Sequence, residues 1–109
     1  SRMKPNVIYK QLRDELERLG WKDEPLELDA VGGTVKTHST LFRNSDTDLY
    51  IVLPRMKPTE LVEPIYLLRV RNVLENAGFW KSLIEQTQTD SQADAMHVLQ
   101  TLAGIKTSR

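Results

Sequence analysis

The chain has no cysteine among its 109 residues. This absence excludes disulfides, thiolate nucleophiles and zinc sites with thiolate ligands. It fits a reducing compartment, and we expect a cytoplasmic protein. The two histidines, His38 and His97, are far apart in the sequence, and no group of carboxylates has the spacing of metal ligands. The sequence therefore predicts no metal site and no other cofactor.

The sequence also lacks a net charge and long apolar runs. Fifteen Lys/Arg balance fifteen Asp/Glu, so a general affinity for nucleic acid or anionic membrane is not indicated. A slight local excess exists, because residues 36–81 contain seven Lys/Arg and five Asp/Glu. The apolar runs are far shorter than the roughly 20 residues needed to cross a bilayer. We expect a soluble protein with no membrane partner.

Glycine-rich phosphate loops and serine nucleophile elbows are absent as well. Gly32-Gly33 is followed by a β-prone stretch and not by the helix and lysine that a phosphate loop needs. What is present is 39% hydrophobic and 28% charged residues, the composition of one ordinary soluble domain.

The first helical pattern begins close to the N-terminal end. Residues 7–19 are predicted to form a helix that Asn6 caps and Gly20 ends. Trp21 follows this stop, and we expect its ring to pack over the helix end. The helix would bury apolar residues that recur every three or four positions, namely Ile8, Leu12, Leu16 and Leu19.

Two further helices are predicted in the second half of the chain. Pro64 suits a first helical position, where its missing amide would be unpaired anyway, and Gly78 ends that helix. A capping-box pattern at Ser91 begins the last helix, which Gly104 ends. The residues between them, 79–90, are predicted to be a short helical segment followed by a linker.

Three β-prone stretches lie between the first two helices, at residues 26–30, 34–43 and 49–53. Residues 22–25 read as a polar connection to the first of them, which alternates as a half-buried strand would. Gly32-Gly33 and the polar run 44–48 supply two turns, so an antiparallel meander is expected. The run Leu49 to Pro54 is the most apolar and β-prone, and is predicted to be the central strand.

The predicted fold class is α+β. It comprises a helix, a three-stranded antiparallel sheet, a second helix, and one or two additional C-terminal helices. The two long helices would cover the same face of the sheet. Residues 1–88 would form an α-β-β-β-α domain, and residues 89–109 a C-terminal helical extension of that domain.

Three strings carry a family resemblance. The first helix ends in Leu19-Gly20-Trp21, the third strand in Val52-Leu53-Pro54-Arg55, and the second helix in Ala77-Gly78-Phe79. They are similar to the corresponding ends in the HicA family of small toxin ribonucleases, whose fold is like that of double-stranded-RNA-binding domains. The resemblance covers residues 8–79. It implies RNA binding, metal-independent endoribonuclease activity and a cognate antitoxin protein as partner.

The resemblance places the catalytic histidine of the family on the second strand, three residues before an aromatic residue. With Phe42 as that aromatic, Ser39 occupies the histidine position and His38 lies one residue earlier. On a regular strand, neighbouring side chains point to opposite faces of the sheet, so His38 would point away from the family's site. Either a bulge restores the direction of His38, or the chain keeps the fold without the chemistry.

His38 is thus the candidate catalytic residue that the resemblance implies. Its imidazole would accept the 2′-hydroxyl proton or protonate the leaving oxygen. The candidate RNA-binding residues are Lys36, Arg55 and Lys57 as phosphate contacts and Phe42 as a stacking platform on the strand face of His38. The opposing interpretation is that His38 is an ordinary polar residue on a half-exposed strand.

Two functions stay open. One is a HicA-like RNA-binding domain, either an active toxin-type endoribonuclease or a relative that lost the chemistry. The other is a non-catalytic protein-interaction module, such as a homodimer formed through the C-terminal helices. The zero net charge and the displaced histidine favour the second function, whereas the strings between residues 49 and 79 favour the first.

Overall fold

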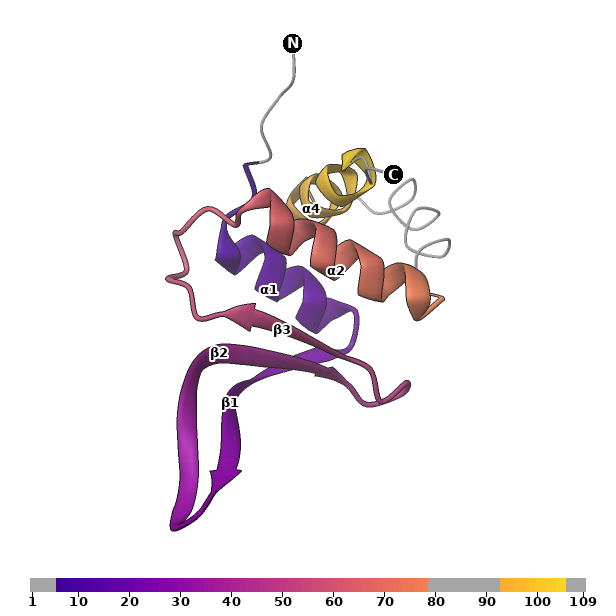
Figure 1. The fold of residues 1–109 in the computed structure, drawn as a ribbon. Helices are drawn as coiled ribbons and strands as arrows, with labels where there is room; N and C mark the ends of the chain where they lie inside the picture. Colours follow the sequence, from indigo (N-terminus) through magenta and orange to yellow (C-terminus); the bar gives the residue numbers. More distant parts are fainter. Residues whose placement is uncertain (1–5, 79–92, 106–109) are drawn as a thin grey trace.

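The computed structural model describes residues 6–78 and 93–105, which form a helix, three strands and two further helices (Figure 1). This order confirms the predicted α+β class. The predicted segment 79–90 and the capping residue Ser91 lie outside the described residues. The elements are α1 (Tyr9–Arg18), β1 (Trp21–Ala30), β2 (Gly33–Asn44), β3 (Tyr50–Pro54), α2 (Pro64–Asn76) and α4 (Ala93–Gly104).

The three strands form one antiparallel sheet in the order β1-β2-β3. The meander is as predicted, but the prediction that the run from residue 49 to 54 is the central strand is wrong. β2 is central, because short turns connect it to both other strands. β3 is an edge strand whose apolar composition reflects its contact with α2: Ile51 and Leu53 are buried, and Arg69 donates a hydrogen bond to the Val52 carbonyl at 2.8 Å.

β1 starts earlier than predicted. Residues 22–25, expected to be a connection, belong to the strand. Pro25 is tolerated there because β1 is an edge strand. The half-buried character expected of residues 26–30 is also wrong, since Leu28 is 55% exposed. The end of the β1–β2 ribbon where the two strands are joined bends away from the helices and projects from the body of the molecule (Figure 1).

One hydrophobic core joins the helices to one face of the sheet. α1 packs on β1 and α2 on β3, which confirms that both helices cover the same face, and α4 packs against α1 and α2 (Figure 1). Trp21 is fully buried, as expected. The core consists of Val7, Tyr9, Leu12, Leu16, Trp21, Phe42, Ile51, Leu53, Val62, Leu67, Val70, Leu74, Val98, Leu99 and Leu102.

The helix ends are partly as predicted. Gly20 and Gly78 follow α1 and α2 with φ of +95° and +77°, and Pro64 is the first residue of α2. The N-cap of α1, however, is Ile8 rather than Asn6. The first two helical amides donate to the carbonyls of residues 60 and 58, at 2.9 and 3.0 Å, so backbone groups distant in sequence replace a side-chain cap.

The turn between β2 and β3 is built around Asn44. This side chain is buried, and its Oδ1 accepts hydrogen bonds from the amides of Asp46 and Thr47 at 2.9 and 3.1 Å. Asp48 adopts a positive φ of 57°. The polar run therefore serves the turn. Within the described ranges, every helix is too short or too polar to span a lipid bilayer.

Candidate nucleic-acid interface

His38 lies at an irregularity in the ladder between β1 and β2. The register shifts between Pro25 and Glu27 of β1, so that Leu26 alone is opposite residues 37–39 of β2. Three residues opposite one make a bulge, and bulges change the direction of the side chains they carry. His38 is the middle residue of this bulge and is exposed to solvent.

Both neighbouring strands hold the bulge in place. On the β1 side, Thr37 Oγ1 donates to the Leu26 carbonyl at 2.9 Å and accepts from the Ser39 amide at 3.2 Å. On the β3 side, the Arg55 amide donates to the His38 carbonyl at 2.8 Å, and Arg55 Nη2 donates to the Thr37 carbonyl at 3.4 Å. The structure thus brings Arg55 to His38.

Lys36 and Lys57 are exposed near the bulge in sequence. Lys36 lies two residues before His38 and is opposite Glu27 of β1. Lys57 lies two residues after Arg55, in the connection to α2. Neither lysine forms a hydrogen bond or ion pair with His38 in the described part of the chain. The two lysines therefore place positive charge near the bulge without a hydrogen bond or ion pair to His38.

Phe42 does not belong to an accessible site. It is fully buried, and its ring packs edge-on against Tyr9 with ring centroids 6.3 Å apart. Stacking on a base requires an exposed ring, so the predicted platform role of Phe42 is not supported. The prediction did not anticipate that the helices cover the face of β2 that carries Phe42.

The two arginines of α2 make contacts away from the bulge, in different directions. Arg69 reaches the Val52 carbonyl and lies over the Tyr66 ring, 5.4 Å from its centroid. Arg71 donates to carbonyls at the C-terminal end of α4 and pairs with Glu75 at 2.8 Å. Both side chains therefore have structural partners.

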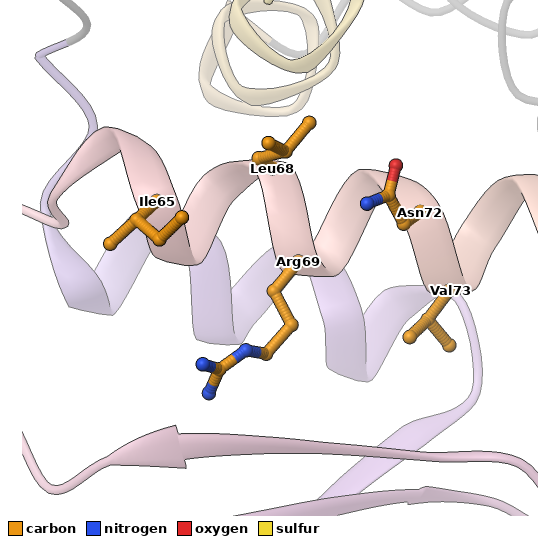
Figure 2. A pocket seen from close by; sticks show the side chains of 5 residues that line it. All are labelled: Ile65, Leu68, Arg69, Asn72 and Val73. Carbon is orange, nitrogen blue, oxygen red and sulfur yellow. The ribbon is translucent and has the colours of Figure 1, made fainter. Parts of the chain in front are cut away.

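A shallow, open hollow lies on the outer side of α2 and is lined by Ile65, Leu68, Arg69, Asn72 and Val73. Figure 2 shows Arg69 extending from the helix toward the sheet. The hollow has one ionisable lining residue, and that residue is engaged with β3. Acid–base chemistry needs convergent titratable groups, so this hollow is no candidate for a reaction site.

Sequence reasoning missed one buried carboxylate. Glu15 of α1 is almost fully buried, with Arg18 Nε donating to its Oε1. Among the described residues, its Oε2 has no hydrogen-bond partner. The three-residue spacing of Glu15 and Arg18 is equally typical of a surface pair, so no pattern in the sequence indicates the burial of Glu15. In the described residues, no three His, Cys, Asp or Glu side chains come together as metal ligands would.

The bulge therefore offers one exposed imidazole with a guanidinium group anchored beside it. An imidazole transfers protons near neutral pH, and a guanidinium group binds phosphate oxygens. Arg55 uses one of its five N–H donors on the Thr37 carbonyl, which leaves others for an anion. This combination can act on a phosphodiester without a metal ion.

Compared with protein-family models, curated proteins and solved structures, the chain shows no match. The resemblance to the HicA family rests on the strings around Gly20, Pro54 and Gly78.

Proposed function

We propose that the chain is a HicA-like RNA-binding domain that cleaves RNA without a metal ion, with His38 as the acid–base residue. The bulge at residues 37–39 is the observation that carries this proposal. The position of His38, one residue before the family's histidine, leaves two alternatives: a bulge that restores its direction, or a fold that has lost the activity. A bulge centred on an exposed His38 supports an active site.

The proposed reaction is attack of a ribose 2′-oxygen on the adjacent phosphorus. The imidazole of His38 accepts the 2′-hydroxyl proton as the new O–P bond forms, and returns a proton to the 5′-oxygen as its bond to phosphorus breaks. Arg55 stabilises the charge that develops on the phosphate oxygens. Lys36 and Lys57 contact neighbouring phosphates, and Phe42 stays in the core. The partner that this function implies is a cognate antitoxin protein.

The test is RNA turnover by the purified His38→Ala variant. Because general acid–base catalysis contributes about 100-fold or more, we expect at least that loss of rate, with an unchanged circular dichroism spectrum. His97→Ala is the matched control, since His97 lies on α4 and contacts the Asn6 carbonyl instead. Binding of a non-cleavable RNA should weaken steeply with salt. Equal turnover by wild type and His38→Ala would remove the catalytic role.

The second candidate is a non-catalytic interaction module that dimerises through its C-terminal helices. The zero net charge favours it. Against it, Val98, Leu99 and Leu102 of α4 are already buried in the core of their own chain. These three apolar side chains of α4 are therefore not free to bind a second copy, and we place this function second.

A further inference from the structure

We call the part of the β1–β2 ribbon beyond the bulge, from Glu27 to Lys36, the arm. It projects from the body of the molecule (Figure 1). Leu28 and Val35 are directly opposite one another in the arm and are 55% and 52% exposed, and Val31 at its tip is fully exposed. A two-stranded ribbon is only marginally stable by itself, and exposed apolar patches mark interaction sites.

The apolar side of the arm continues onto the body of the sheet. Leu41 of β2 pairs with Val52 of β3, and this pair alternates with the buried pair Phe42–Ile51 that faces the helices. Leu41 and Val52 therefore face the opposite way. Tyr50 lies two residues before Val52, shares its face and is 62% exposed.

The same alternation applies to β1. Trp21 is buried beneath the helices, so Leu26 and Leu28 lie on the opposite face of the sheet. None of the described helices lies over this face (Figure 1). We call it the open face; its exposed apolar residues are Leu28, Val35 and Tyr50, whereas Leu26 and Val52 are half-buried and Leu41 is only 7% exposed.

The charges on the arm indicate the kind of partner. Its other face carries Glu27 directly opposite Lys36, together with Asp29. Apart from Lys36, which lies next to the bulge, the charged residues of the arm are the carboxylates Glu27 and Asp29, so the part of the arm beyond Lys36 is not suited to nucleic acid. An apolar face with a polar back is instead suited to a protein surface, with the polar back left in water.

We propose that the open face is a dimer interface in which the arm of each copy lies across the body sheet of the other. The arm ladder has four residue pairs and the body ladder between β2 and β3 has five, which correspond to about 13 and 17 Å of strand. The arm therefore fits the length of the sheet that it would cover.

A second copy can cover both the arm and the body part of the open face. A partner on the body sheet alone leaves Leu28 and Val35 in water, whereas a two-fold axis buries both the arm and the body of each chain in two identical contacts. Two contacts also double the buried area, which matters because stable interfaces need about 800 Å² per partner. The chain has zero net charge, so two copies do not repel each other.

Sedimentation of the full chain tests the proposal. Wild type should be a dimer and Leu28→Glu a monomer with an unchanged circular dichroism spectrum, because Leu28 is more than half exposed within its own chain. Ile65→Glu is the matched control: Ile65 is 57% exposed but lies on α2, and this variant should stay dimeric. A monomeric wild type, a dimeric Leu28→Glu, or dissociation only by Ile65→Glu would overturn the proposal.

Cross-linking provides a second measurement, since the chain has no cysteine of its own. Chains carrying Leu28→Cys, mixed with chains carrying Tyr50→Cys and exposed to a mild oxidant, should form a disulfide-linked heterodimer. Leu28→Cys mixed with Ile65→Cys should not. Equal cross-linking in the two mixtures would show random collision and would contradict the arrangement.

Discussion

Tyr9 connects α1 to the sheet. Its ring is buried, and its hydroxyl group hydrogen-bonds with the Thr40 side chain. Burial raises the pKa of the Tyr9 phenol above its ordinary value of 10.0, and the Asp23 carboxylate acts in the same direction. The Thr40 hydrogen bond and Arg13 oppose this rise without cancelling it. The native state therefore keeps the Tyr9 proton more firmly than the unfolded chain does.

This pKa shift predicts a loss of stability in alkali. The contribution of Tyr9 is complete below pH 10, where the unfolded phenol is protonated, and is lost as the pH rises through the higher native pKa. Tyr9→Phe should cost about 1 kcal/mol at pH 7, because it removes a hydrogen bond. The same variant should lose less stability than wild type between pH 9 and 11. Urea unfolding across this range is the measurement, and parallel declines would contradict the prediction.

Residue environments differ in how far the sequence predicts them. The burial of Trp21 and the positive φ of Gly20 follow from a helix stop, which is a local pattern. The burial of Phe42 was missed, because it depends on which face of β2 meets the helices. The anchoring of His38 depends on the hydrogen bond that Thr37 donates to Leu26 of β1 and on the one that Arg55, directly after β3, donates to the His38 carbonyl, which no local pattern reveals.

At the scale of elements, α4 ends against α2. Arg71 donates hydrogen bonds to the carbonyls of Leu102, at 3.4 Å, and Ile105, while its side chain is only 17% exposed. The last carbonyls of a helix lack partners within it, and a cation there also stabilises the helix dipole. Arg71 therefore caps a helix that begins more than twenty residues later.

Arg71→Met should lower the free energy of unfolding by about 1–2 kcal/mol, because it removes both the hydrogen bonds and the cation while keeping the aliphatic bulk. Glu75→Gln is the control, since it removes only the ion pair with Arg71, worth about 0.3–0.5 kcal/mol. Urea unfolding of both variants separates the two contributions. If Glu75→Gln lowers the free energy of unfolding as much as Arg71→Met does, Arg71 stabilises the protein through the ion pair and not through the helix cap.

Elements were predicted best where periodicity within one segment determines them. The two long helices have an apolar period and glycine stops, and both were found with only small shifts of their ends. The start of β1 and the edge position of β3 were predicted wrongly. Strand order and pairing depend on partners distant in sequence, and the apolar character of β3 comes from contact with α2.

At the scale of the whole molecule, α4 is part of the core rather than an appendage. Val98, Leu99 and Leu102 are at most 3% exposed and pack with residues of α1 and α2. Burial of each such side chain contributes about 1.5–3 kcal/mol. Their sum is comparable to the roughly 5–15 kcal/mol by which a domain of this size is stable.

Removing residues 89–109 should therefore abolish cooperative folding, rather than only weaken an association between copies. Far-UV circular dichroism combined with urea unfolding should show a broad transition or none. A truncated chain that unfolds as sharply as the full chain, at a similar urea concentration, would show that α4 is dispensable for the core.

The hydrogen bonds at the start of α1 have a consequence for the order of folding. The amides of Tyr9 and Lys10 donate to carbonyls of Glu60 and Pro58, and the Val62 amide donates to the Val7 carbonyl. The first amides of α1 thus find their hydrogen-bond acceptors about fifty residues later in the sequence, and contacts between such distant residues form slowly. On a ribosome, α1 would wait for the connection after β3, so the earliest helix of the chain is among the last elements to be completed.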